Sequence, residues 1–398
     1  MGKSILEDRP VTSGMDRVLG SPPGMVMAVV VFGAITTLSL GTEPAITTQL
    51  ERELRLPSHV AGLLVGTEFV ASMLAALPAA MLCRRASPRR VAVISALTFL
   101  LANLCAGFDA AVPALFIWRA LSGFAGGALL VAVLATAARC QNPDRVYAIW
   151  VTGQTLASAA ALDLLPPLLQ THGLRSVYLL MAFATVLALP LLRSLWRQPS
   201  PPTAARPAEP GRRSETLGAL SVLGLFYAVA SGTWAFAADR GATSGLVSSQ
   251  VSAWLAAANI AGIGGALLAA WIGQSRARTL LIVAGHGQMV IVLGLLASAN
   301  SAIAFAVFAL LLQFAWSFTA PFLLAQAAVA GQPDETMGAA SCVMGAGLAV
   351  GPILTGALLE RQGGYPLAAA GSGVLLVAAL LLLAWLVSTG RTRARTKA

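Results

Sequence analysis

The chain has 398 residues, of which 57% are hydrophobic and 11% charged, and its mean hydropathy is +0.78. These values exclude an ordinary water-soluble domain, in which about 25% of the residues are charged. The net charge of +10 does not indicate nucleic acid binding, because the basic residues follow the loops between apolar segments one by one.

The apolar residues fall into twelve blocks of about 20 residues, the length of a helix that crosses the hydrocarbon core of a bilayer. These blocks show no alternation with period two, which argues against a transmembrane β-barrel. The sequence therefore predicts an all-α membrane protein with twelve transmembrane helices. In chain order the predicted spans are 25–46, 60–82, 91–108, 113–138, 146–169, 176–195, 217–238, 248–272, 279–298, 302–329, 337–359 and 366–388.

The basic residues predict the orientation of these spans. With the N-terminus inside, 20 of the 26 Lys and Arg residues fall in cytoplasmic segments, five fall in outer loops, and Arg119 lies within a span. Both termini are therefore predicted to be cytoplasmic. The polar residues 1–24 contain no cleavable apolar segment, so we expect the first span to be retained. The abundance of Ala and the near-exclusive use of Arg over Lys indicate a GC-rich bacterial genome, and hence the inner membrane.

A proline-rich segment divides the spans into two sets of six. Residues 196–216 contain five Pro and no apolar run, which predicts a cytoplasmic linker between an N-terminal bundle (1–195) and a C-terminal bundle with a basic tail (217–398). The two halves repeat at a shift of about 190 residues, which aligns Glu68 with Asn259. Parallel repeats of this kind occur in secondary transporters, whose substrate site lies between the halves near the membrane midplane.

Three local patterns resemble the major facilitator superfamily, over roughly residues 20–390. They are an Arg-Gly pattern at 119–127, a Gly-Pro pattern at 345–356 and the turn Gly173-Leu174-Arg175. The resemblance implies two pseudo-symmetric six-helix bundles that rock about a central cavity. It also implies four gating positions: Gly123, Gly127, Gly351 and Pro352.

The chain departs from the family pattern at two places. The turn at 79–90, between spans two and three, keeps the arginines of the family pattern but lacks its acidic residue. In span five, Leu162-Asp163 stands where drug/proton antiporters of this family have Gly-Pro. The second departure weakens an antiporter assignment and draws attention to Asp163.

Ionisable side chains within the spans of the first half predict the coupling site. A charge in a hydrocarbon-embedded helix costs about 2.5 kcal/mol or more, so such groups usually pair or line a polar cavity. At a helix rise of about 1.5 Å per residue, Glu68 and Asp163 lie roughly 13 Å from the outer edge, and Arg119 roughly 15 Å. Asn259 falls at the same depth as Glu68. We therefore predict one polar layer at mid-membrane.

Each of these charges allows a functional and a structural role. Arg119 acts on a neighbouring carboxylate or on an anionic substrate group, or it forms a permanent ion pair between helices. Glu68 and Asp163 are two acids against the one base Arg119, so one carboxylate has no partner. We expect this carboxylate to be Asp163, which then binds a proton or cation. The alternative is that Asp163 is the structural partner of Arg119. Glu43 precedes Pro44, and we favour a solvated residue at the end of span one over a residue that faces the cavity.

The second half has no formal charge at this depth, and its candidates are aromatic or polar. Aromatic rings with a polar edge and side-chain amides suit an amphiphilic organic molecule. His286 is expected to be a core histidine rather than a proton relay. The predicted substrate-binding residues are Trp234, Trp254, Asn259, Gln313 and Trp316.

The predicted function is secondary active transport of a small organic solute that is cationic or neutral and amphiphilic. Protons would drive transport through Asp163 or Glu68, with Arg119 and Glu43 as further coupling candidates, and export is favoured. A proton-coupled importer of a small nutrient, and a membrane sensor or lipid-handling protein that does not transport, remain as alternatives.

No catalytic pattern is expected to contribute. The sequence has no complete phosphate-binding loop and no zinc-ligand or catalytic-triad spacing, so we expect neither an enzyme nor a cofactor or metal. The expected partners are the small-molecule substrate, protons and the lipid bilayer, and not nucleic acid. The protein is expected to be a monomer.

Overall fold

The computed structural model describes residues 22–109, 111–137, 143–195, 213–272, 277–330 and 333–396. These residues are almost entirely helical, and no strand occurs among them. The helices are α2 (Pro23–Glu53), α3 (Ser58–Arg85), α4 (Pro88–Phe108), α5 (Val112–Ala137), α6 (Pro143–His172), α7 (Leu174–Ala188), η1 (Leu189–Ser194), α8 (Arg213–Ala235), α9 (Ala237–Thr243), α10 (Ser248–Ile272), α11 (Arg278–Ser298), α12 (Ala302–Ala330), α13 (Pro333–Leu359) and α14 (Gly364–Thr396).

Eleven spans within the described ranges are long and apolar enough to cross a membrane. Helix α6 matches the remaining predicted span by its position and its length of 30 residues, but polar residues such as Gln154 and Asp163 interrupt its apolar sequence. The predicted all-helical membrane architecture is confirmed. The predicted linker lies mostly outside the described residues, and α8 begins within it at Arg213.

Helix α2 is longer than the predicted first span. It continues through Pro44 to Glu53, so the proline does not end the helix. A proline removes one backbone hydrogen bond, and neighbouring helices compensate for this loss within a membrane bundle. Because the helix does not end at Pro44, Glu43 lies inside the bundle rather than at a solvated helix end.

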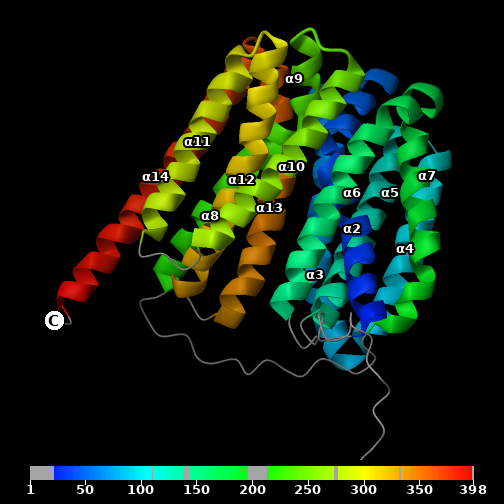
Figure 1. The fold of residues 1–398 in the computed structure, drawn as a ribbon, viewed down its shortest axis with the longest axis horizontal. Coiled ribbons are helices and arrows are strands. Elements are labelled where there is room, and N and C mark those ends of the chain that lie inside the picture. Colours follow the sequence, from blue (N-terminus) through cyan, green and yellow to red (C-terminus); the bar gives the residue numbers. More distant parts are fainter. Residues whose placement is uncertain are drawn as a thin grey trace, which may run out of the picture.

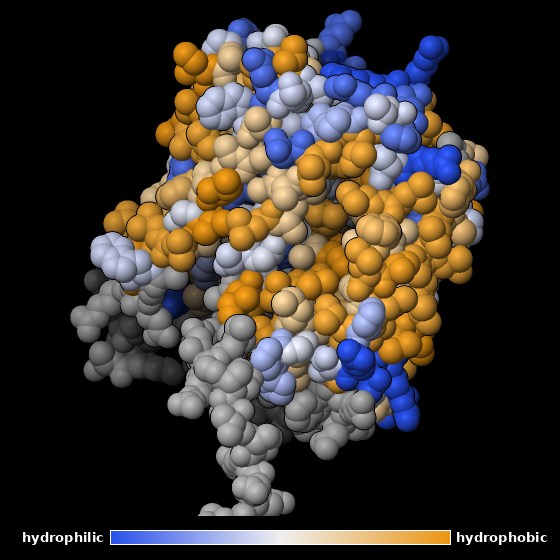
Figure 2. All heavy atoms as spheres, turned by 45° about the vertical axis from the view of Figure 1, so that its right-hand side comes forward, coloured by the Kyte–Doolittle hydropathy of each residue, from blue (hydrophilic) through white to orange (hydrophobic). Residues whose placement is uncertain are grey.

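The buried apolar residues form two separate cores. One core belongs to α2–α7 and η1, and the other to α8–α14, where Leu162 of α6 joins it. Figure 1 shows the helices of the first half, blue to green, beside those of the second half, green to red. Hydrophobic side chains cover the middle of the face drawn in Figure 2, and hydrophilic ones gather at its upper end, as expected for a protein that spans a bilayer.

Short turns join consecutive helices at the end of the molecule that we call the outer end, after the predicted orientation. Between α6 and α7, Gly173 has a φ of 62°, which favours glycine because a side chain is strained in this region. The Glu53 carboxylate accepts a hydrogen bond of 2.7 Å from the backbone N–H of Leu174, at the start of α7. The predicted turn at residues 173–175 therefore fixes α7 against the end of α2.

The two bundles contact each other along the outer halves of α3 and α13. A Cβ atom at Gly62 would collide with the carbonyl oxygen of Pro352, and one at Gly356 would lie 2.5 Å from the carbonyl oxygen of Ser58. The contact extends as far as Met73, which packs against Gly345. The outer halves of these helices therefore lie too close together for a solute to pass between them.

The inner half of the same face of α3 is uncovered. Leu77 and Met81 follow Met73 at intervals of four residues, so they lie on the same side of the helix. Their exposed fractions are 63% and 54%. The bundles are thus closed at the outer end, while this face of α3 is open toward the inner end.

Candidate functional site

The centre of the candidate site is a buried ion pair between Arg119 of α5 and Glu68 of α3. Arg119 is 3% exposed and Glu68 is 8% exposed. The guanidinium also donates hydrogen bonds to the Ser39 hydroxyl at 3.2 Å and to the Asn103 side-chain oxygen at 3.1 Å. Ser39 in turn donates to the Glu68 carboxylate at 2.9 Å, so α2 also contacts both members of the ion pair.

Further groups hold the guanidinium of Arg119 in one orientation. The side-chain amide of Asn103 donates to the Ser122 hydroxyl at 3.0 Å and to the carbonyl of Phe99 at 2.9 Å, which fixes the oxygen that faces Arg119. The ring of Tyr178 lies 5.0 Å from the guanidinium carbon, a cation–π contact. Five helices, α2 to α5 and α7, therefore contribute to this cluster.

Glycines on α5 allow the ion pair to form. A Cβ atom at Gly123 would collide with the carbonyl oxygen of Glu68, and one at Gly127 would collide with that of Ser72. Both glycines therefore let the backbones of α5 and α3 approach closely. Gly123 does so about one turn after Arg119, and Gly127 about one turn further inward. The structure places these two predicted gating residues inside the first bundle, next to the ion pair.

We expect Gly123→Ala to destabilise the protein, because the added methyl group forces α5 away from α3 at Glu68. Overpacking of this kind costs typically about 1–3 kcal/mol. Thermal unfolding of the purified protein in detergent measures the loss. The matched control is Gly264→Ala, because a Cβ atom there meets no other atom within 4 Å. Equal unfolding temperatures for the two variants would contradict close packing at Gly123.

Glu43 lies in the interior, and the expectation of a solvated boundary residue is wrong. It is 1% exposed, because α2 continues through Pro44. Among the described residues neither of its carboxylate oxygens has a hydrogen-bond partner. Glu43 shares a small cavity with Glu68, Arg119 and Tyr178. Two carboxylates therefore face one guanidinium within the first bundle.

Asp163 does not belong to this cluster and makes no contact with Glu68 or Arg119, although the sequence predicts a similar depth for all three. Helix α6 faces α2 through Ser158, which packs against Gly41. Five residues at 3.6 residues per turn rotate Asp163 about 140° away from that face. Asp163 is exposed and has no ion-pair partner in the described part of the chain, while the adjacent Leu162 joins the second core.

The register of α6 and α10 places Asp163 and Asn259 at matching positions along neighbouring helices. Gln170 of α6 and Ser252 of α10 line the same outer pocket. Asp163 precedes Gln170 by seven residues and Asn259 follows Ser252 by seven, which is about two turns toward the membrane interior in each case. The two helices pack against each other. These positions therefore lie along the boundary between the two bundles.

The tryptophans of the second half differ in their surroundings. Trp234 is completely buried, and its indole N–H donates to the Leu40 carbonyl of the first bundle at 2.9 Å. In this conformation Trp234 therefore joins the two bundles, because α8 packs against α2 at this level. Trp316 is 8% exposed and contacts Tyr227 edge to face, with centroids 5.7 Å apart. Trp254 is 38% exposed.

The remaining predicted residues of the second half lie at helix contacts. Gln313 and Asn259 are 9% and 6% exposed, and the amide of Asn259 donates to the carbonyl of Leu255 at 3.4 Å. A Cβ atom at Gly351 would collide with Ala228 of α8, while Pro352 contacts α3 across the bundles. His286 is buried, with Nδ1 2.8 Å from the Ile282 carbonyl oxygen, in agreement with a core position.

Sequence reasoning did not select three residues of the cluster. Ser39, Asn103 and Tyr178 all touch Glu68 or Arg119, yet none was a candidate. An asparagine in the middle of an otherwise apolar span is a usable signal, because a buried amide needs partners. Serine and tyrosine occur too often in membrane helices to give one.

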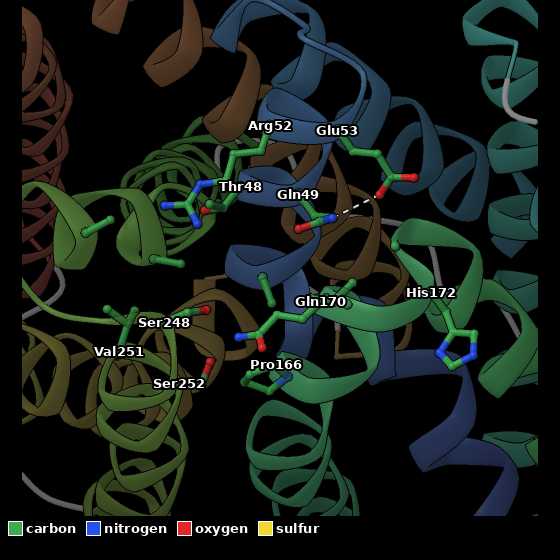
Figure 3. Close-up of a pocket in the computed structure, with 15 residues that line it drawn as sticks. Thr48, Gln49, Arg52, Glu53, Pro166, Gln170, His172, Ser248, Val251 and Ser252 are labelled. Carbon is green, nitrogen blue, oxygen red and sulfur yellow. Dashed lines mark hydrogen bonds between the residues drawn. The ribbon is translucent and has the colours of Figure 1, made fainter.

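A second cavity lies at the outer end between the bundles and has a volume of about 580 Å³. Figure 3 shows the side chains of Arg52 and Gln170 reaching into the space beside Ser248 and Ser252, whereas Glu53 and His172 point away. Gln49 of the same wall donates to Glu53 at 2.9 Å. Polar groups from α2, α6 and α10 therefore surround an outer vestibule.

No group of three or more His, Cys, Asp or Glu residues that could hold a metal ion occurs in the ranges that the structure describes. The charged cluster has one basic and two acidic side chains, and the guanidinium of Arg119 pairs with one of the two acids. The chemistry available there is proton uptake and rearrangement of an ion pair.

Comparison with known proteins identifies relatives of the fold. The sequence model of the Major Facilitator Superfamily matches residues 25–336. A crystal structure of a POT family transporter in complex with 5-aminolevulinic acid has a TM-score of 0.76 at 12% identity, covering 92% of this chain and 96% of that chain. A POT peptide transporter has a TM-score of 0.76 at 14% identity, covering 92% and 95%.

A third similar structure is a bacterial homologue of the human lysosomal transporter Spinster, in an inward-facing and occupied conformation. Its TM-score is 0.66 at 14% identity, and the match covers 97% of this chain and 98% of that chain. No curated protein matches the chain. At these identities the solved structures show a shared fold and do not indicate a substrate.

Proposed function

Because the chain belongs to the major facilitator superfamily, we propose that it is a proton-coupled secondary transporter that exports a small organic solute by alternating access. The solute is cationic or neutral and amphiphilic. The observation that carries the proposal is the buried Glu68–Arg119 pair beside Glu43, whose carboxylate has no partner among the described residues. A protein that only binds a membrane does not need this arrangement, because buried charge is costly.

Proton uptake by Glu43 is the proposed coupling step. With a proton on Glu43, the cluster has one negative and one positive charge and is neutral. When the proton leaves, Glu43 competes with Glu68 for the guanidinium of Arg119. Since Glu43 and Glu68 lie on different helices, α2 and α3, this exchange of partners shifts the two helices relative to each other.

The proposed solute site lies between the bundles, along α6 and α10. Asp163 supplies a negative charge for a cationic solute, since it is exposed and unpaired within the described ranges. Asn259 and Gln313 offer amides, and Trp254 and Trp316 offer aromatic surface on the side of the second bundle. The outer vestibule at Arg52 and Gln170 then lies on the path of the solute when the outer end opens.

The conformational change is a rocking of one bundle against the other. The close packing of Gly62 and Gly66 on Pro352 and Ala349 closes the outer end. We propose that Gly351 and Pro352 form the hinge of α13 that releases this contact. Trp234 then contacts solute only after the outer end has opened. From the distribution of the basic residues we infer that both termini face the cytoplasm of a bacterium, and we propose that the protein acts as a monomer in the inner membrane.

The test is transport in proteoliposomes with an imposed pH gradient. We expect the amphiphilic cation ethidium to accumulate in response to the gradient, and less so when an ionophore removes the gradient. An exporter that exchanges solute for protons accumulates the solute when the lumen is acidic. Accumulation only when the outside is acidic would identify a proton-coupled importer. Absence of flux for ethidium, a neutral amphiphile and small nutrients alike would contradict transport and favour a sensor.

Asp163→Asn is expected to distinguish cationic from neutral solutes. Removal of the carboxylate takes away the charge that faces a cation, and an interaction of about 1.4 kcal/mol already corresponds to a tenfold change in affinity. We expect ethidium transport to fall by about this factor, while transport of neutral chloramphenicol remains. Asp109→Asn in the exposed α4–α5 turn is the control. Equal loss for both solutes would contradict a role of Asp163 in charge recognition.

A further inference from the structure

A histidine joins the two bundles at the outer end. The backbone N–H of His59, in the first turn of α3, donates to one carboxylate oxygen of Glu360 at 2.7 Å. The ring atom Nδ1 of His59 lies 2.5 Å from the other oxygen of Glu360. Glu360 directly follows α13, so one carboxylate of the second bundle binds the N-terminal turn of a helix in the first bundle.

We propose that His59 and Glu360 form a second proton site, separate from the Glu43 cluster, which responds to the outside pH and keeps the outer end closed when protonated. The ligand is a proton from the outer solution, bound by the imidazole of His59. The proposal rests on alternating access as the proposed function and adds a regulatory control of the conformation.

The charges around the contact favour a cation at His59. Glu51 of α2 lies within electrostatic range of both Glu360 and Asp239 of α9, so three carboxylates approach each other where the bundles meet. Tyr365 of α14 donates to Asp239 at 2.5 Å. A positive charge on His59 reduces the repulsion among these acids in the closed conformation.

The fixed cations nearby do not replace His59. Arg240 of α9 acts on Asp239 rather than on Glu360, while its Nε donates to the carbonyl of Leu296 at 2.7 Å and its guanidinium lies 5.0 Å from the ring of Tyr365. Arg52 of α2 acts on Glu51 and reaches into the outer vestibule. Arg361 follows Glu360 on the exposed turn. His59 is therefore the partner of Glu360 whose charge can be switched.

The contact is accessible to the outer solution. The side chains of His59 and Glu360 are 49% and 33% exposed, so protons exchange without opening of the bundles. Exposure also limits the strength of the pair, because exposed ion pairs contribute modestly and are screened by salt. We expect a change of about two- to fivefold in the ratio of closed to open molecules, which corresponds to the range measured for such pairs.

The direction of the pH effect follows from the conformation in which His59 and Glu360 are paired. The positive charge on His59 is stabilised by Glu360 only while the outer end is closed. Binding of a proton to His59 therefore shifts the population toward the closed form, and acidification of the outer solution favours this state. As the pH rises, the neutral ring keeps only a hydrogen bond to Glu360, and the outer end opens more easily.

The experiment measures the conformation directly in the full-length protein. Nitroxide labels are attached at Ala111→Cys and Ala302→Cys, two exposed positions at the outer ends of α5 and α12, after replacement of the four native cysteines. Pulsed electron paramagnetic resonance in lipid nanodiscs then gives the distance distribution. We expect the ratio of short-distance (closed) to long-distance (open) molecules to increase about two- to fivefold from pH 8 to pH 5.5.

Three variants decide the result. His59→Gln is expected to lose the pH response, and His59→Lys is expected to remain closed at both pH values. The control His172→Gln changes an exposed outer histidine that contacts Thr171 of its own helix, and it should respond as the wild type does. A wild-type response in His59→Gln overturns the proposal. No transport is measured, so failure of the proposed solute or direction leaves this result unchanged.

Discussion

Arg119→Gln is expected to produce a protein with a strongly reduced unfolding temperature and no gradient-driven transport. The substitution removes the only cation that contacts Glu68 in the described part of the chain and leaves a buried carboxylate with Ser39 as its donor. Removing one partner of a buried ion pair costs about 3–5 kcal/mol. Thermal unfolding in detergent and ethidium flux in proteoliposomes measure the two effects.

The double variant Arg119→Gln/Glu68→Gln separates stability from function. It removes both charges, so we expect the unfolding temperature to recover much of the loss, since a neutral buried pair of similar shape is often tolerated. Proton-driven transport should stay absent. Arg361→Gln, at an exposed outer position, is the control for loss of an arginine. If the double variant is as unstable as the single one, an uncompensated charge is not the cause.

The depth of charged residues could be predicted from the sequence, but their direction around the helix could not. Helix rise is constant, so counting residues from the outer edge correctly placed Glu68 and Arg119 at one level, where they pair. Asp163 has a similar depth, yet Ser158 determines which face of α6 meets α2, and Asp163 points elsewhere. The contact face depends on small residues such as Gly41, which a single sequence does not mark.

The end of α2 could not be predicted because Pro44 allows two outcomes. In water a proline after the first turn usually ends or kinks a helix, whereas neighbouring helices in a membrane compensate for the missing hydrogen bond. Here the helix continues, and Glu43 becomes a buried member of the cluster. The division into two sets of helices followed from composition alone, because the proline-rich segment contains no apolar run.

The two halves show why a repeat predicts position better than chemistry. The shift of about 190 residues predicts Asn259 as the counterpart of Glu68, and the two residues lie in α10 and α3. The amide of Asn259, however, donates to the carbonyl of Leu255 in its own helix. The carboxylate of Glu68 on α3 meets the guanidinium of Arg119, whereas α10 packs against α6 and α12 and makes no ion pair among the described residues. In the proposed mechanism, this asymmetry corresponds to proton chemistry in the first bundle and solute contacts at the boundary.

Glu43→Gln is expected to uncouple transport from the pH gradient without unfolding the protein. The substitution keeps the shape of the side chain and removes the group proposed to carry the proton. One pH unit is worth about 1.4 kcal/mol per proton, so a carrier that moves one proton per solute can accumulate the solute about tenfold. For Glu43→Gln we expect ethidium to equilibrate across the membrane, with an accumulation ratio near one.

Exchange of labelled for unlabelled ethidium, without a gradient, shows that the variant still moves solute, and Asp109→Asn controls for loss of an acid elsewhere. Accumulation by Glu43→Gln at the wild-type level removes Glu43 from the coupling step. Should Asp163→Asn abolish the gradient response instead, for neutral as well as cationic solutes, the proton is carried at the boundary between the bundles. Transport of the neutral solute distinguishes Glu43 from Asp163 as the proton carrier. A neutral solute does not need Asp163 for charge recognition, but it still needs the proton to accumulate.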